Sequence, residues 1–505
     1  MSDTDIVGRC IGEASPSNVI FISKKIPMLG DYVKIDFDDR SVLAIITNLL
    51  RGNVAITEDI FDPKVVDRIK SIEGEDFYIR GNAKIIGDLE TLEIPKTPPP
   101  PGTPIRRADD ETLRKVFSQG EYGLRIGTLI SHPEVIVELN VNKIVSRHLA
   151  ILAITGAGKS NAVANLIDEI LKIGGCIVAF DMHSEYIDAK FPNGSVNPIM
   201  LRINPVYLSF HELEILLNIP SSAYVQSRYF YMAYNDTMDS VRNGTLTNEF
   251  FDEVQRHLNS YLENDDFSSD RKSITAVINK VNDLLNRYGF ILDSDQIDIA
   301  KNIRLGEVNV IDLGTADEDV ADVIVSHTLR KILYERKRYR RQRAGIGFPV
   351  FLILEEAHIL APTGRSTLSK YWITRIAREG RKFGVGLCLV SQRPKALDSN
   401  ALSQANNMII LKLVEPGDQR HVQSASETLS EDLLEHLSSF NIGEAVLLGM
   451  MTKVPALVKI DKFQGELSVG DIDIVKKWKE AKEEKEKSVK DQKGDIQDIM
   501  GGEEW

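Results

Sequence analysis

Residues 149–161 of the 505-residue chain read LAILAITGAGKSN, an apolar run followed by a glycine-rich segment. Residues 149–154 are apolar, which is typical of a strand buried within a sheet, and the amphipathic residues 160–173 predict a helix. Residues 153–160 match the P-loop pattern GxxxxGK[ST], with Ala153 in place of the first glycine. Strand, glycine-rich turn and helix together predict a phosphate site at the edge of an α/β sheet.

The P-loop residues are suited to ATP and Mg²⁺. Glycines let backbone N–H groups turn toward a phosphate, where the helix N-terminus adds partial positive charge. Lys159 is expected to reach the β- and γ-phosphates, and Ser160 to place its hydroxyl on Mg²⁺. The alternative, a glycine-rich turn that binds nothing, fits the flanking strand and helix less well. The predicted nucleotide-binding residues are Thr155, Gly156, Ala157, Gly158, Lys159, Ser160 and Asn161.

A second apolar run, residues 351–354, ends in two acidic residues, Glu355 and Glu356. A buried strand carries such carboxylates to the carboxyl edge of a parallel sheet, where ligands of doubly wound folds bind. We expect Glu355 to hold Mg²⁺ through water and Glu356 to orient and activate the attacking water. Alone, this pattern is a common exit from a strand; beside a P-loop it indicates catalysis.

Polar residues follow two further strands. Asp181, His183 and Glu185 come just after the run CIVAFDM, and each is a candidate for assisting Mg²⁺ or water, for capping a helix, or for facing a channel. Gln392 ends the run LCLVSQ, where an amide can sense the γ-phosphate. The role of the first three stays open, whereas Gln392 is a predicted catalytic residue.

Four other residues are candidates for the edge of the nucleotide site. Arg381 follows a predicted helix at 372–380, where an arginine can cross a subunit boundary and stabilise transition-state charge in a neighbour. A favourable cation at a helix C-terminus is the alternative. Arg147 lies just before the first buried strand, and Lys459 and Ile460 lie in the run KVPALVKIDKF, which we expect to return to the base or ribose.

The chain divides into segments of different pattern. Short β-rich runs up to residue 95 predict a small barrel or sandwich, whereas strands alternate with helices after residue 149 and predict a mostly parallel sheet covered on both faces. The expected segments are 1–95 as the β-rich domain, 96–145 as a Pro-rich connector with lead-in strands, 146–206 and 301–465 as the α/β core, 207–300 as a helical insertion, and 466–505 as a charged helix or tail.

Composition limits where the chain acts. Hydrophobic residues make up 43% and charged residues 27%, as in ordinary globular proteins, and no apolar run is long enough to cross a bilayer. The N-terminus lacks a secretory signal, and the three cysteines show no CxxC spacing, so we expect a cytoplasmic protein. The net charge of −13 excludes a uniformly basic surface, although a channel lined by positive charge remains compatible with DNA binding. The basic run 330–343 is read as a solvated helix face or a contact for nucleic acid or a partner.

These motifs resemble the HerA–FtsK branch of RecA-like motor ATPases, and in particular the archaeal HerA DNA translocases. The resemblance covers residues 5 to about 465. It rests on TGAGKSN at 155–161, FDMHSEY at 180–186, LILEEAHILAP at 352–362, REGRKFGVGLCLVSQRP at 378–394 and the run PPPPGTP. It implies a RecA-like P-loop core preceded by a small N-terminal β-barrel. Ala153 departs from the family's P-loop glycine, and Glu355 stands where many P-loop enzymes have aspartate.

The resemblance also implies a mechanism and partners. It implies a homohexameric ring with ATP sites between subunits, in which Arg381 acts on the neighbour's site. Duplex DNA would pass through the channel, and a NurA-type nuclease, docked on the barrel, would resect DNA ends during double-strand break repair. We expect channel contacts from Arg365 and Lys370 in the loop 362–370 and from the region after Glu185. Such contacts to phosphates weaken with salt and ignore sequence.

Two other functions remain open at this point. One is a nucleotide-regulated scaffold that recruits and orients a nuclease with little translocation. The other is a P-loop motor that moves protein or single-stranded DNA. The presence of Lys159, Glu356 and Arg381 favours a motor, because a scaffold needs nucleotide binding but not water activation. Ring stoichiometry, direction of movement and strand separation are not determined by these patterns.

Overall fold

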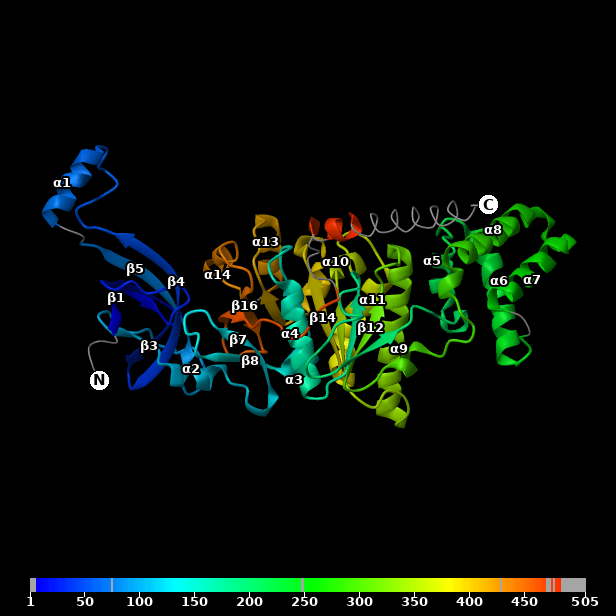
Figure 1. Ribbon diagram of the computed structural model, residues 1–505, viewed down its shortest axis with the longest axis horizontal. Helices are drawn as coiled ribbons and strands as arrows, with labels where there is room; N and C mark the ends of the chain where they lie inside the picture. Colours follow the sequence, from blue (N-terminus) through cyan, green and yellow to red (C-terminus); the bar gives the residue numbers. More distant parts are fainter. Residues whose placement is uncertain are drawn as a thin grey trace, which may run out of the picture.

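The computed structural model describes residues 6–73, 76–246, 249–426, 429–468, 474–475 and 477–482. The molecule is elongated, with a barrel at one end, an α/β core in the middle and a helical domain at the other end (Figure 1). Most of the expected charged C-terminal segment, 466–505, lies outside the described residues. No helix in the described ranges is long and apolar enough to cross a membrane.

The N-terminal domain is a closed barrel with strand order β1-β2-β5-β4-β3-β6, which confirms a barrel rather than a sandwich. Its strands are β1 Ile6–Ser15, β2 Asn18–Ser23, β3 Tyr32–Phe37, β4 Arg40–Gly52, β5 Tyr78–Asp88 and β6 Pro104–Arg107. Alternate residues such as Val33 and Ile35 point into a separate core. Helix α1 (Pro63–Glu73) projects from the barrel between β4 and β5 (Figure 1).

The barrel extends beyond the expected boundary at residue 95. The prolines interrupt the strand ladder, as expected, but the chain then turns at Gly102 (φ 86°) and returns as β6, which closes the barrel between β1 and β3. Proline is tolerated at the first position of a strand, where Pro104 stands. The Pro-rich stretch therefore lies within the barrel instead of following it.

The core is built on one sheet of eleven strands in the order β11-β12-β10-β13-β14-β9-β15-β16-β17-β7-β8. The strands from β11 to β15 in this order are parallel, and the remaining strands pair antiparallel. The bounds are β7 Gly123–Leu129, β8 Ile136–Asn140, β9 Leu149–Leu152, β10 Ile177–Asp181, β11 Ser195–Ile199, β12 Glu307–Asp312, β13 Val350–Leu354, β14 Val385–Ser391, β15 Asn407–Ile410, β16 Glu444–Gly449 and β17 Ala456–Ile460.

The core therefore begins before the expected residue 146. Strands β7 and β8 form its edge, because β7 pairs with β17 from the far end of the chain. Gly127 makes this pairing possible, since a Cβ atom there would lie 2.1 Å from the carbonyl oxygen of Lys459. In the middle of the sheet, β9, β10 and β13 are buried throughout, as expected for parallel strands covered on both faces.

Helices cover the sheet and form the far end of the molecule (Figure 1). The core helices are α2 Asp110–Phe117, α3 Val141–Arg147, α4 Lys159–Lys172, α9 Glu318–Gln342, α10 Ala357–Leu360, α11 Leu368–Glu379, α12 Ser399–Ser403, α13 Pro416–Ala425 and α14 Glu431–His436. The far end consists of α5 Phe210–Leu216, α6 Tyr224–Arg242, α7 Phe250–Glu263 and α8 Arg271–Tyr288, within the expected insertion 207–300. An aromatic cluster around Phe210 and Phe230 packs α5 against α6.

Candidate ATP-binding site

The P-loop joins the buried strand β9 to helix α4, which begins at Lys159. Gly156 (φ 77°) and Gly158 (φ 101°) adopt the left-handed backbone that glycine favours, and a Cβ atom at Gly156 would meet open space. The N-terminus of α4, with its first backbone N–H groups, therefore lies at an open turn. This geometry suits an anion, because such N–H groups have no partner within the helix.

The P-loop lysine meets both acidic residues at the end of β13. Lys159 Nζ lies 3.1 Å from Glu355 Oε2 and 2.9 Å from Glu356 Oε1. Strand β9, which leads into the P-loop, and strand β13, which ends before Glu355, are separated only by β14 in the sheet. Their carboxyl ends therefore lie at one edge. The structure thus brings together the three residues that the sequence predicts for phosphate, metal and water.

For both Lys159 and Glu355, burial and the neighbouring charges shift the pKa in opposite directions. Burial disfavours the charged form of Lys159, but the attraction of Glu355 and Glu356 outweighs it and raises the lysine pKa. Burial also raises the pKa of Glu355, more than Lys159 and Tyr186 lower it. The positive charge of Lys159 therefore stabilises a carboxylate that burial disfavours.

Glu356 is held in an unusual backbone conformation at the start of α10. Its φ of 46° lies in the left-handed region that residues with a Cβ rarely adopt, a form of strain that clusters at functional sites. His183 Nε2 lies 3.4 Å from its Oε1 and His358 Nδ1 lies 3.2 Å from its Oε2. The His358 geometry does not make a hydrogen bond, so Oε2 is buried without a hydrogen-bond partner among the described residues.

Two residues of this cluster were not predicted from the sequence. Tyr186 donates a hydrogen bond of 2.7 Å to Glu355 Oε1, and burial raises its pKa well above the usual value, so its hydroxyl keeps the proton. His358 lies within 3.2 Å of Ser391 Oγ as well as beside Glu356. The run FDMHSEY contains Tyr186, but no spacing rule distinguishes it from a core tyrosine.

The three open candidates after β10 take different places. His183 reaches Glu356, as described. Asp181 accepts the backbone N–H groups of His183 and Tyr186, so it shapes the turn that presents both side chains. The backbone of Glu185 accepts from Ser468, and the following residues pair with the C-terminal segment through Lys190 and Glu466.

Gln392 lies against the P-loop. Thr155 Oγ1 donates a hydrogen bond of 2.7 Å to Gln392 Oε1, which links the loop to the end of β14. The predicted γ-phosphate sensor and the P-loop are therefore joined at the carboxyl edge of the sheet.

The other P-loop candidates contact the C-terminal part of the core. Asn161 turns its side chain to Asp461 and Phe463, with bonds of 2.9 and 2.8 Å, and so serves the packing of this segment. Gly443 donates to the Ala157 carbonyl at 2.9 Å and accepts from the Ile460 N–H at 2.8 Å. The end of β17, with Lys459 and Ile460, therefore lies next to the P-loop.

Arg147 and Arg381 lie away from this cluster in the same chain. Arg147 ends α3, just before β9, and Arg381 lies in η7 (Gly380–Phe383), just before β14. Both strands run toward the P-loop edge, so these arginines stand at the opposite edge of the sheet. Helix α3 packs against η7, which brings the two arginines to one side of the molecule.

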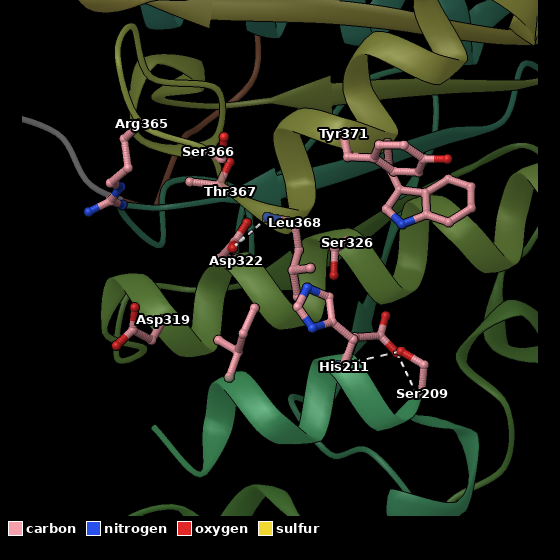
Figure 2. A pocket seen from close by; sticks show the side chains of 13 residues that line it. Ser209, His211, Asp319, Asp322, Ser326, Arg365, Ser366, Thr367, Leu368 and Tyr371 are labelled. Carbon is pink, nitrogen blue, oxygen red and sulfur yellow. Dashed lines mark hydrogen bonds between the residues drawn. The ribbon is translucent and has the colours of Figure 1, made fainter. Parts of the chain in front are cut away.

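The loop with the DNA-contact candidates lies beside a cavity of about 640 Å³ between α5, α9 and the start of α11 (Figure 2). Arg365 is among the residues that line this cavity, and its side chain pairs with Glu318 at 3.2 Å. Lys370 instead pairs with Asp398 at 2.8 Å and donates to the Pro362 carbonyl, so its charge is used to hold the base of the loop.

The site fits a nucleotide with Mg²⁺. The described residues contain no cluster of three or more metal-ligating His, Cys, Asp or Glu side chains. Magnesium in nucleotide sites needs only one or two protein oxygens, because water and phosphate oxygens complete its shell. Ser160 at the start of α4 and Glu355 supply such oxygens, and the unpartnered Glu356 Oε2 offers an acceptor.

Comparison with known proteins agrees with this site. A protein-family model described as the central domain of helicase HerA matches residues 124–332, and a second family model, described as the HAS barrel domain, matches residues 7–91. The DNA double-strand break repair helicase HerA of Sulfolobus acidocaldarius is 42% identical over 492 residues, which cover 95% of this chain and 97% of that protein. A probable helicase of Methanocaldococcus jannaschii is 41% identical over 490 residues, covering 95% of each chain.

Among solved structures, VirB4 of Thermoanaerobacter pseudethanolicus superimposes with a TM-score of 0.48 at 14% identity, over 68% of this chain and 97% of that one. The sequence relatives match over nearly the whole length, and the barrel and the P-loop core both agree with the matched models. The chain therefore belongs to the HerA helicase family of P-loop ATPases.

Proposed function

We propose that this chain is the subunit of a hexameric ring that hydrolyses ATP to move duplex DNA, and that it works with a NurA-type nuclease in DNA-end resection during double-strand break repair. The observation that carries the proposal is the junction of Lys159 with Glu355 and Glu356 in a HerA-family chain. The relatives named as double-strand break repair helicases support the biological setting. We expect the ring to act in the cytoplasm.

Each residue of the junction has a task in hydrolysis. Bound Mg²⁺ would neutralise charge on the phosphates, and Ser160 and Glu355 are the residues that would hold it. Lys159 would leave the glutamates for the phosphates, because the anion competes for the same ammonium group. Glu356 would then accept a proton from the attacking water.

The position of Arg381 supports a site shared between subunits. It stands at the opposite edge of the sheet from its own P-loop, and its exposed side chain has no hydrogen-bond or ion-pair partner within the described ranges. An arginine supplied from a neighbour stabilises transition-state charge and accelerates hydrolysis about 10³- to 10⁵-fold in related chemistry. Arg147, on the same side, would reach the same neighbouring nucleotide.

Arg365 is the better supported DNA contact. Its side chain is 57% exposed, whereas Lys370 is paired below the loop. Asp319 and Asp322 line the adjacent cavity, and their charge disfavours DNA phosphates there. We therefore place DNA at the tip of the loop, where an exposed arginine can leave Glu318 for a phosphate.

ATP hydrolysis with and without blunt duplex DNA tests the motor. We expect duplex DNA to stimulate the wild-type protein, and Glu356→Gln to lose at least 100-fold of that activity, since water activation contributes about 10²- to 10⁴-fold. Nucleotide binding should persist in the variant because Lys159 remains. A wild-type rate that ignores DNA, matched by the variant, would refute the proposal.

The scaffold remains the second candidate function. Under it, nuclease recruitment would need ATP binding but would survive Glu356→Gln without loss of resection. The strained backbone of Glu356 favours the motor, because a residue that only supports a scaffold gains nothing from that conformation. Resection of a long duplex by the nuclease together with wild-type or Glu356→Gln rings separates the two.

A further inference from the structure

The turn that carries Arg381 is held by the last turns of helix α9. This turn, η7, lies between the end of α11 and the start of β14, and α9 packs against both. The sequence 330–343 at this end of α9 is strongly basic. Several of its side chains bind other parts of the same chain, so they are neither simply solvated nor free to bind DNA.

Two arginines of α9 bond to the backbone of the Arg381 turn. Arg336 Nε donates to the Phe383 carbonyl at 2.8 Å, and its Nη1 donates to the Ile346 carbonyl at 2.8 Å. Arg340 donates to the carbonyl of Lys382, one residue from Arg381. Arginine is suited to this task because its planar fork bonds two acceptors in a fixed geometry.

An ion pair fixes the entry to the same turn. Lys337 Nζ lies 2.5 Å from Glu379 Oε2, and Arg375 Nε lies 2.7 Å from Glu379 Oε1. Both bonds hold the last residue of α11, which directly precedes η7. The basic side chains of α9 thus reach the residues before and after Arg381.

The backbone of the turn has little room to move. A Cβ atom at Gly380 would lie 2.4 Å from the Val385 carbonyl oxygen, so helix and strand meet in close contact there. Gly384 adopts a left-handed φ of 68°, and a Cβ atom on it would lie 3.1 Å from Arg336 Nη2. Arg336 therefore fills the space beside this glycine as well as bonding the turn.

Not every basic residue of α9 takes part. Arg338 lies 3.6 Å from Glu335 on its own helix, and Arg341 is exposed without a hydrogen bond or ion pair inside the described ranges. The contacts to η7 therefore belong to one face of the helix. Arg341 provides a control of equal charge on the same helix.

We propose that Arg336 and Arg340 are positioning residues that fix the backbone of the Arg381 turn, so that Arg381 is presented to the ATP site of the neighbouring subunit. The inference rests on the proposed function, in which Arg381 acts across a subunit boundary. Positioning has a large effect, since a displacement of about 1 Å can cost about 100-fold in rate. Arg336 and Arg340 would act through the turn without touching nucleotide.

The first test compares Arg336→Gln, Arg340→Gln and the control Arg341→Gln in DNA-stimulated ATP hydrolysis. We expect the first two to lower kcat about 10- to 100-fold with KM for ATP changed less than about threefold, because the nucleotide contacts remain. Arg341→Gln should match the wild type. Arg340→Gln is the second variant because its exposed side chain can be replaced without opening the core. Normal kcat in both variants, or an equal loss in the control, would overturn the inference.

The second test mixes subunits within rings. A ring containing Arg336→Gln and Glu356→Gln subunits has interfaces at which an intact P-loop site receives an intact Arg381, so activity should exceed the sum of the two parent rings. The mixture of Arg381→Ala with Glu356→Gln should behave in the same way.

If only the Arg381→Ala mixture gains activity, Arg336 acts within its own subunit and the inference fails. If neither mixture gains activity, the shared site of the proposed function fails. A gain in the Arg336→Gln mixture alone would show that Arg336 does not act through Arg381.

Discussion

Tyr186 orients Glu355 through a single hydrogen bond of 2.7 Å. Tyr186→Phe keeps the ring and removes only this donor. We expect the Mg²⁺ concentration for half-maximal ATP hydrolysis to rise about tenfold, since loss of a group that orients a metal ligand costs about 10- to 100-fold in metal affinity. Titration of Mg²⁺ into the DNA-stimulated reaction at saturating ATP measures this change.

Tyr32→Phe is the matched control. Tyr32 is also fully buried and donates one hydrogen bond of 2.8 Å, to the Pro455 carbonyl, between the barrel and the core. Either variant should lose about 1 kcal/mol of stability with its hydrogen bond. An equal shift of the Mg²⁺ requirement in both variants would mean that Tyr186 affects only stability.

At the scale of residues, motif spacing predicted the centre of the site but only part of its surroundings. Lys159, Glu355 and Glu356 were predicted because a P-loop and a carboxylate strand end share one edge of a parallel sheet. Tyr186 and His358 were missed, because their role arises from contacts across strands that no local pattern records.

Glu212 joins the helical insertion to the core at the scale of elements. It caps α5 through Ser209 and accepts from Arg330 Nη2 of α9 at 2.8 Å. Burial raises the pKa of Glu212, but the neighbouring His327 and Arg330 outweigh it and lower the pKa to about 2. Because the folded state binds this proton less readily than the unfolded chain, the stabilisation is complete above pH 4.5 and is lost as the pH falls toward 2.

We therefore expect Glu212→Gln to lower the free energy of unfolding by up to about 3 kcal/mol at pH 7, with the difference from wild type shrinking below pH 4.5. Guanidinium unfolding followed by circular dichroism at pH 7, 4 and 3 measures it. Glu111→Gln, which removes an exposed pair with Lys115, should leave the free energy of unfolding nearly unchanged because solvent screens that pair. A pH-independent loss in Glu212→Gln would contradict the ionic origin.

Individual strands were easier to predict than the strands with which they pair. Apolar runs marked β9, β10 and β13 because a parallel strand buried on both faces has a continuous hydrophobic sequence. Strand β6 was not predicted and β7 was assigned to the connector, because closing a barrel or extending a sheet depends on pairing with strands far away in the chain. Local sequence records a strand's tendency to form, not its neighbour.

At the scale of the whole molecule, the barrel stands at the end of the chain's long axis, away from the helical insertion (Figure 1). Its projection around α1 exposes large apolar side chains, with Phe61 92% and Ile72 82% exposed. Both residues belong to the segment between β4 and β5, and exposed apolar side chains that form a contiguous patch mark interaction sites. This supports the barrel end as the proposed docking face for the nuclease.

Phe61→Ser combined with Ile72→Ser should weaken binding of a NurA-type nuclease at least tenfold, because each loss removes about 1.5–3 kcal/mol of apolar burial. DNA-stimulated ATP hydrolysis should stay near the wild-type rate, since the P-loop cluster lies in a separate domain. Phe290→Ser is the control, as this side chain is 67% exposed and lies within the helical insertion. Titrating the purified nuclease by calorimetry measures all three proteins. If the control weakens binding and the barrel variant does not, the nuclease docks on the helical insertion and the barrel needs another partner.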